Sequence, residues 1–323
     1  MSAESSPVGW DRPSFTLDDF RSDERAMARC LDLARVAART DLPILILGET
    51  GTGKSLLARA IHNSSVRANL PFVAFNAAAL SESLLDSQLF GHERGAFTGA
   101  DRLVKGKFEL ADGGTLFIDE IADMSLPAQA KILRAVEQGE FERLGGERLR
   151  SANVRLLTAT HVTVAEFLSG SGFRKDLFYR LSGLTVTIPP LRERRADLPA
   201  LIASKIRDAA VHCGIEIEGL DHEAADLVFG YSWPGNLREL DRVIQAAVSV
   251  TTPPIVTADA IRLASPGIAA GRSGAVREAA RDLRLDTVVR RHVDEVLRHA
   301  GGNKRQTARI LGVSRSTLDR KLR

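Results

Sequence analysis

Cysteine is scarce in this chain of 323 residues, which carries Cys30 and Cys213 and no third cysteine. The two lie far apart, without the paired spacing of a zinc site, and this usage is typical of reduced thiols in the cytosol. Long apolar runs are also missing, because the strongest, at 42–47, contains Pro43 and is far shorter than the ~20 residues of a membrane helix. The N-terminus lacks the basic-then-apolar pattern of a signal peptide. We therefore expect a cytoplasmic protein that does not contact a membrane.

Charge is present in both signs but is unevenly distributed. The whole chain has a net charge of +3, whereas residues 271–323 hold 14 Lys and Arg against 6 Asp and Glu, a balance of +8. The rest of the chain therefore carries −5. A basic C-terminal segment on a mildly acidic body indicates a local contact with nucleic acid, although a solvated basic helix would have the same composition.

Alternating strand and helix patterns predict the fold of the first half. Short apolar segments at 44–47, 72–75, 115–118 and 154–157 are predicted as strands, with helical patterns between them. This alternation indicates an α/β domain whose parallel sheet is covered by helices on both faces. Helical patterns return from Ala196 to about Ala264 and over the last 40 residues. A chain of this length has room for two or three domains.

Shifts in composition set the predicted domain boundaries. We expect a short tail, an α/β domain, a small helical domain, a Ser-, Pro- and Gly-rich linker and a helical C-terminal domain, in that order. The corresponding ranges are 1–22, 23–190, 191–264, 265–283 and 284–323.

A phosphate-binding loop is predicted where the first strand ends. The segment Gly48-Glu49-Thr50-Gly51-Thr52-Gly53-Lys54-Ser55 matches G-x-x-x-x-G-K-[ST] between a predicted strand and a predicted helix. Its glycines let backbone N–H groups surround phosphates, and the helix N-terminus adds partial positive charge. Lys54 is expected to reach the β- and γ-phosphates of a nucleoside triphosphate, and Ser55 to bind Mg²⁺.

An acidic pair ends the predicted strand at 115–118. Asp119 is placed to hold the same Mg²⁺, and Glu120 to polarise the attacking water. The alternative is that the pair caps the N-terminus of a helix.

The hexapeptide Gly95-Ala96-Phe97-Thr98-Gly99-Ala100 lies between these two nucleotide motifs. Its glycines permit a tight turn that presents Phe97 and Thr98 to a partner. Packing of Phe97 into the core is the alternative. Six motifs, namely 48–55, Asn76, 95–100, 119–120, 173–181 and 233–240, occur in the order of the sigma-54-dependent activators, and residues 24–264 resemble that family of NtrC-like AAA+ ATPases.

The resemblance implies an AAA+ core with a helical lid, ATP and Mg²⁺ as cofactors, and a homo-oligomeric ring, with six subunits as the family expectation. It also implies that residues 95–100 contact sigma-54. Asn76 is similar to the switch residue that holds Glu120 until the γ-phosphate is sensed. Arg238 resembles the sensor arginine of the lid.

Two arginines resemble fingers that act on the ATP of a neighbouring subunit. Arg174 and Arg180 lie in the segment 173–181, and an arginine supplied in trans can raise the rate of phosphoryl transfer by about 10³–10⁵. An ion pair within the subunit is the alternative for both. Thr160-His161 stands where the family usually has Thr-Asn, and Ser55 stands where it often has an acidic residue.

The C-terminal pattern predicts a helix-turn-helix. One helix ends at Gly301-Gly302, a second begins near Asn303, and a basic third helix begins at Ser314. This stretch resembles a Fis-like DNA-binding module, with a dimerising helical hairpin as the alternative. The expected contacts to double-stranded DNA come from Lys304, Arg305, Arg315, Ser316, Thr317, Arg320 and Lys321.

The features together predict an ATP-hydrolysing activator that binds enhancer DNA and remodels closed complexes of sigma-54 RNA polymerase. A DNA-binding regulator or heteromeric partner that does not activate is one alternative, and a general AAA+ remodelling motor is another. Because about 22 residues precede the AAA+ core, we expect control by a separate regulator, a hetero-partner or expression level.

Overall fold

A computed structural model of the chain describes residues 15–78, 82–170, 172–268, 304 and 307. Contacts divide the chain into two units, Met1–Ser265 and Pro266–Arg323. The predicted helix-turn-helix lies outside the described residues, apart from Lys304, which is helical and exposed, and the buried Thr307. Six predicted DNA contacts therefore lie outside them, at Arg305, Arg315, Ser316, Thr317, Arg320 and Lys321.

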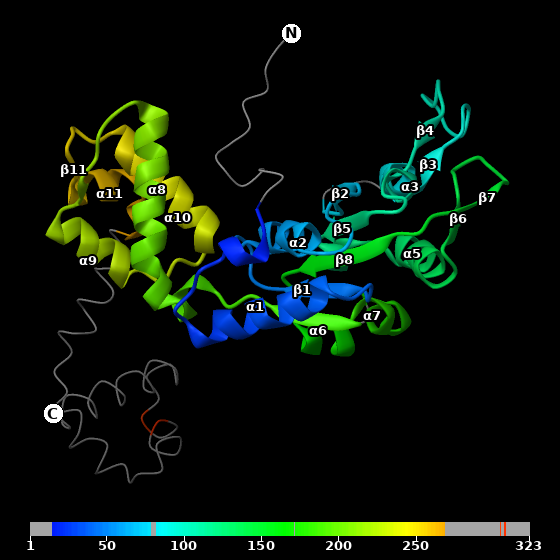
Figure 1. Cartoon of the computed structure of the whole chain (residues 1–323), viewed down its shortest axis with the longest axis horizontal. Helices are drawn as coiled ribbons and strands as arrows, with labels where there is room; N and C mark the ends of the chain where they lie inside the picture. The colour runs from blue at the N-terminus through cyan, green and yellow to red at the C-terminus, as the bar shows by residue number, and fades with distance from the viewer. Residues whose placement is uncertain (1–14, 79–81, 171, 269–303, 305–306, 308–323) are drawn as a thin grey trace. The chain divides into compact units, whose positions relative to one another are not determined.

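A parallel sheet forms the centre of the first unit, with the strand order β2-β5-β8-β1-β9 (Figure 1). Every neighbouring pair in it is parallel. The strands are β1 Ile44–Leu47, β2 Phe72–Asn76, β5 Thr115–Asp119, β8 Arg155–Thr160 and β9 Leu184–Thr187. The four predicted strands are confirmed to within a few residues, whereas the edge strand β9 was not predicted.

Helices cover both faces of this sheet, as predicted. Because successive side chains of a strand point to opposite faces, Ile44 and Ile46 of β1 belong to one hydrophobic core and Leu45 and Leu47 to another. The first core includes α1 and α2, and the second includes α3, α5 and α7. Their bounds are α1 Arg25–Ala38, α2 Lys54–Asn63, α3 Glu82–Phe90, α5 Leu126–Gln138 and α7 Lys175–Leu181.

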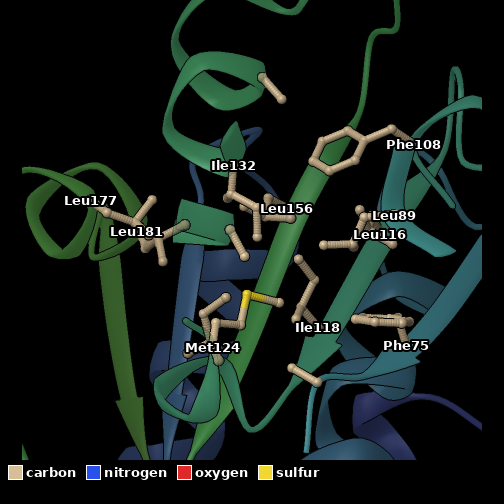
Figure 2. Packing of buried hydrophobic residues seen from close by; sticks show 14 of the residues in the cluster. Phe75, Leu89, Phe108, Leu116, Ile118, Met124, Ile132, Leu156, Leu177 and Leu181 are labelled. Atoms are coloured by element: carbon tan, nitrogen blue, oxygen red, sulfur yellow. The ribbon is translucent and has the colours of Figure 1, made fainter. Parts of the chain in front are cut away.

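Figure 2 shows the second core at close range. Leu116 and Ile118 from β5 and Leu156 from β8 face Met124 and Ile132 across the sheet surface. These side chains are at most 4% exposed. Burial of each large aliphatic side chain stabilises the folded state by about 1.5–3 kcal/mol. This packing holds the carboxyl ends of the strands in fixed positions.

Two short antiparallel hairpins project from the same end of the sheet (Figure 1). The first pairs β3 Gly91–His92 with β4 Val104–Lys105, and the second pairs β6 Glu140–Glu142 with β7 Leu149–Ser151. Backbone hydrogen bonds join them, from Glu93 N to Leu144 O at 3.0 Å and from Leu144 N to Gly91 O at 3.0 Å. The short helix α4 Lys107–Leu110 follows the first hairpin, whereas the short helix α6 Val164–Ser169 precedes α7 and contacts it.

Residues after the sheet form the helical lid. Its elements are η3 Leu191–Glu193, η4 Arg195–Asp197, α8 Leu198–Cys213, β10 Gly219–Leu220, α9 His222–Gly230, α10 Asn236–Ser249, β11 Ile255–Val256 and α11 Ala258–Ala264. Trp233 is fully buried between α9 and α10, and its Nε1 donates to Val228 O at 3.0 Å. Among the described helices, none has both the length and the apolar character needed to cross a membrane.

Candidate functional site

The phosphate loop connects β1 to α2 and has the backbone shape that the sequence predicts. Gly51 and Gly53 have φ angles of 81° and 101°, in the left-handed region that favours glycine. A Cβ on Gly51 would lie 2.3 Å from the carbonyl oxygen of Gly235 in the lid. Lys54 begins α2, and its Nζ donates to Gly48 O at 2.9 Å. The lysine side chain therefore folds back across the loop to its first residue.

Ser55 and Asp119 lie together at the end of the loop. The Ser55 hydroxyl donates to Asp119 Oδ2 at 3.1 Å. Mg²⁺ prefers oxygen ligands of this kind and completes its coordination with phosphate oxygens and water. The two residues therefore fit the predicted magnesium ion beside a phosphate-binding loop.

Glu120 is held from two sides. Its Oε2 accepts from His161 Nδ1 at 2.9 Å and from His161 N at 3.3 Å, and its Oε1 lies 3.4 Å from Lys54 Nζ. Burial raises the pKa of Glu120, but the hydrogen bond from His161 and the charge of Lys54 outweigh it and leave the pKa below its usual value. The carboxylate is thus ionised near neutral pH, as a base for the attacking water must be.

The side chain of Glu120 does not act as a helix cap. Glu120 precedes the short helix η2 Ile121–Asp123 with φ 52° and ψ 50°, and makes no side-chain capping bond. A left-handed backbone at a residue other than glycine is uncommon and tends to occur at functional sites. The Glu120 carboxylate therefore does not cap the N-terminus of a helix.

Asn76, at the end of β2, is paired in register with Asp119. Its Oδ1 accepts from Ala78 N at 2.8 Å, while Glu120 is bound to Lys54 and His161. The switch role of Asn76 stays a prediction. Thr160 lies at the end of β8, where its carbonyl oxygen accepts from Gly48 N at 3.2 Å. This bond fixes the position of His161 beside the loop.

A cavity of about 240 Å³ lies between the phosphate loop and the lid. Its wall includes Lys54, Ser55, Asp119 and Glu120 from the core, together with Arg238 from α10. The structure therefore brings the predicted lid arginine to the predicted loop. Four further lid residues, Leu201, Lys205, Leu237 and Asp241, line the same cavity and were not predicted. Helical periodicity would have placed them on one face of each helix but not in this cavity.

Glu49, which was predicted to bind nucleotide, joins the loop to the lid. Its two carboxylate oxygens accept from Arg192 at 2.7 and 2.8 Å. That bond is the main cause that lowers the pKa of Glu49. Asn236 Nδ2 donates to Glu49 Oε2 at 3.2 Å and to Thr50 O at 3.1 Å, while its Oδ1 accepts from Leu191 N at 2.7 Å. Asn236 is fully buried at a φ of 53°, so its position is fixed by these bonds.

The two predicted arginine fingers lie at α7, outside the wall of the cavity. Arg174 forms an ion pair with Asp176, with Nη2 and Oδ2 2.7 Å apart, and both side chains are largely exposed. Arg180 Nη2 donates to Val136 O at 3.3 Å. The intrasubunit alternative is thus realised for Arg174 in the single chain. Because water screens an exposed ion pair, this pair would hold Arg174 only weakly.

The hexapeptide loop forms the tip of the β3–β4 hairpin. Gly95 N donates to Ala100 O at 2.8 Å, and Ala100 N donates to Phe97 O at 3.0 Å. Gly95 and Gly99 have φ angles of 83° and 96°, and a Cβ on either would meet nothing within 4 Å. Backbone conformation, not space, therefore requires glycine here. Phe97 is 42% exposed and Thr98 is exposed, so neither packs into the core.

The stem of this loop is held by a buried ionic cluster that sequence patterns did not reveal. Arg143 is 5% exposed; it donates to Glu109 Oε1 and Oε2 at 2.6 Å each, and to Glu93 Oε1 at 2.9 Å. Burial raises the pKa of Glu109, but the bonds and charge of Arg143 leave it below its usual value. Arg150 adds a second guanidinium 3.3 Å from Glu93. The cluster thereby joins the two hairpins and α4 at the base of the hexapeptide.

Three family models match successive parts of the chain. Residues 20–187 match the sigma-54 interaction domain, 192–270 the AAA+ ATPase lid domain, and 285–323 the Fis family of bacterial regulatory proteins. The first of these spans more than half of the chain.

Individual relatives agree with these matches. The transcriptional regulatory protein ZraR of Escherichia coli (strain K12) is 40% identical over 324 residues, which cover 99% of this chain and 72% of that protein. Regulatory protein AtoC of the same strain is 42% identical over 297 residues, covering 91% of this chain and 64% of its own length. The crystal structure of NtrX from Brucella abortus in complex with ATP aligns with a TM-score of 0.68 at 32% identity, covering 94% of this chain and 68% of that one.

Proposed function

We propose that this chain, which belongs to the family of transcription regulators with a sigma-54 interaction domain, uses ATP hydrolysis to open promoters bound by sigma-54 RNA polymerase. The chain is an AAA+ ATPase with a helical lid and a Fis-type DNA-binding domain. Hydrolysis would supply the energy for remodelling the polymerase complex. The closed complex is remodelled by the hexapeptide loop while the C-terminal domain holds enhancer DNA.

Hydrolysis is assigned to the residues that surround the phosphate loop. Lys54 and the backbone amides of the loop bind the phosphates, and Glu120 accepts the proton of the attacking water on its carboxylate. His161 orients that carboxylate through the bond to Oε2. Mg²⁺, held by Ser55 and Asp119, would neutralise charge on the phosphate oxygens. Asn76, Thr160 and Arg238 are proposed to sense the nucleotide.

Ring assembly would complete the site. Arg174 and Arg180 lie away from the cavity of their own chain, which supports a role at the ATP of a neighbouring subunit in a homo-oligomer, with six subunits expected. For Arg174 this role requires the weak pair with Asp176 to open. Glu49 and Thr50, bound to Asn236, would pass changes at the phosphate loop to the lid.

The observation that carries the proposal is the exposed tip of the hexapeptide, with Phe97 and Thr98 on a turn that only glycines adopt without strain. We expect Gly95, Ala96, Phe97, Thr98, Gly99 and Ala100 to contact sigma-54. An exposed aromatic beside a hydroxyl suits such a contact. The buried cluster around Arg143 supports the loop from below, so movement of the core can be transmitted to the tip.

The test is open-complex formation on a sigma-54 promoter with ATP, with wild type beside Thr98→Ala. We expect the wild type to open the promoter, and the variant to hydrolyse ATP and bind DNA without opening it. Thr252→Ala, at an exposed position in the lid, is the matched control and should behave as wild type. Full opening by Thr98→Ala would refute the assigned contact. A wild type that binds DNA and hydrolyses ATP but opens no promoter would favour the non-activating regulator.

A further inference from the structure

We propose that Lys205 of the lid helix α8 is a further phosphate-binding residue of the nucleotide site, which exchanges its ion pair with Asp241 for the terminal phosphate of a nucleoside triphosphate. The inference rests on the ATPase activity and extends it, and it does not depend on the contact with sigma-54. The same exchange would draw α8 toward the phosphate loop only when a triphosphate is bound.

Lys205 occupies an unusual environment for a lysine. Its side chain is 6% exposed, although lysine is among the residues least often buried unless it is paired. Nζ lies 2.7 Å from Oδ1 of Asp241 on α10, and both residues line the cavity that contains Lys54 and Ser55. A buried ammonium group thus lies in the wall of the site that receives the phosphates.

The position of the cavity indicates which part of the nucleotide Lys205 would meet. The core side of the wall is formed by the phosphate loop with Ser55, Asp119 and Glu120. These residues serve the magnesium ion and the water that attacks the γ-phosphate, so this end of the site receives the terminal phosphate. Lys205 lines the same cavity from the lid, and we therefore assign it to phosphate oxygens.

Charge balance in the cavity favours an exchange over a fixed pair. The wall contains three cationic side chains and three acidic ones, which are Lys54, Lys205 and Arg238 against Asp119, Glu120 and Asp241. An entering triphosphate adds negative charge that Mg²⁺ offsets only in part. Releasing Lys205 from Asp241 supplies a further cation at the place where that charge arrives.

Lys205 and Asp241 differ in how well water can solvate each side chain once the ion pair opens. The Asp241 side chain is 52% exposed and can return to water, whereas the Lys205 side chain is 6% exposed, so a phosphate oxygen that replaces Asp241 keeps a negative charge beside the buried ammonium group. Lysine also suits the exchange, because its four-carbon stem is flexible and its three donors accept many geometries. A phosphate oxygen meets both requirements.

The competing explanation is a structural ion pair that only fastens α8 to α10. The two explanations predict different changes in nucleotide affinity when Lys205 or Asp241 is replaced. Under the structural explanation, removing either partner weakens the lid and affects all nucleotides alike. Under the exchange, removing Lys205 weakens triphosphate binding, whereas removing the charge of Asp241 strengthens it by releasing Lys205.

The experiment is calorimetric titration of the full chain with the magnesium complexes of ADP and of the non-hydrolysable analogue adenosine 5′-(β,γ-imido)triphosphate. Lys205→Met should weaken binding of the analogue by about tenfold, the effect of losing one charged hydrogen bond, and binding of ADP less than about twofold. Lys205→Arg should retain most of the affinity for the analogue. Asp241→Asn should bind the analogue more tightly than wild type.

A matched control and defined outcomes separate the explanations. Arg207→Met removes one cation from an exposed position of α8 that lines a different groove of the lid, and it should bind both nucleotides as wild type does. Equal losses for ADP and the analogue, or an Asp241→Asn variant that does not bind the analogue more tightly, would overturn the proposal. If Lys205→Met fails to fold, the result for Asp241→Asn decides. A wild type that binds neither nucleotide would instead contradict the ATPase function.

Discussion

Acidification should weaken the folded first unit through one buried imidazole, that of His62. This residue is in the last turn of α2, the helix that begins at the phosphate loop, and its side chain is 2% exposed. Its Nδ1 lies 2.9 Å from the hydroxyl of Thr115. Burial, together with the positive charges of Arg155 and Arg59, lowers the pKa of His62 from 6.5 to about 4.

The sign and size of the effect follow from this shift. Well above pH 6.5 the imidazole is neutral in both the folded and the unfolded state, so His62 adds no dependence on pH there. Between pH 6.5 and about 4 the unfolded chain binds a proton that the folded chain does not, so the free energy of unfolding falls as the pH falls. At pH 5 the loss is about 1–2 kcal/mol after allowance for solvent screening, and below pH 4 it no longer grows.

Urea unfolding followed by circular dichroism at pH 7.5 and pH 5.0 measures this loss. His62→Asn keeps a polar atom near Thr115 but cannot be protonated, so the carboxylates that titrate in both proteins cancel in the comparison. We expect the wild type to lose about 1–2 kcal/mol more than the variant between the two pH values. Equal losses in the two proteins would show that His62 is not a buried neutral imidazole.

Two further predictions concern the phosphate loop and the thiols. Gly51→Ala would bring a Cβ within 2.3 Å of Gly235 O at a backbone φ of 81°, so we expect ATP affinity measured by calorimetry to fall at least about tenfold, with far-UV circular dichroism retained. Unchanged affinity would mean that loop and lid do not meet in this way. Burial raises the pKa of Cys30 to about 11, so iodoacetamide at pH 8 should alkylate the exposed Cys213 well before Cys30, as peptide mass spectrometry would show. Equal labelling rates would contradict the burial of Cys30.

The sequence was most informative where function depends on neighbouring residues. The phosphate loop needs left-handed glycines, a lysine and a hydroxyl within eight positions, so its shape and its place between a strand and a helix could be predicted. The same holds for the hexapeptide, where Gly95 and Gly99 adopt the left-handed angles that a tight turn requires. The strands Ile44–Leu47 and Thr115–Asp119 also match their short apolar patterns.

Contacts between distant segments could not be predicted in the same way. Lys205 and Asp241 lie on different helices, and no local pattern predicts that they pair in the wall of the cavity that the phosphate loop also lines. The pairing of Glu120 with His161 depends on the order of β5 and β8 in the sheet, which periodicity does not supply. Strand β9 was missed because its alternation of Leu184 and Val186 with two threonines is short and only partly buried.

The ionic cluster beneath the hexapeptide has a consequence for protein engineering. Arg143 on one hairpin binds Glu93 on the other and Glu109 on α4, so the loop is supported by residues that are not contiguous with it. A graft of residues 91–105 alone onto another ATPase would carry Glu93 without the guanidinium of Arg143 that neutralises it. The smallest transplantable piece therefore comprises both hairpins and the helix that carries Glu109, and a change of charge at any one of these positions calls for compensation at the others.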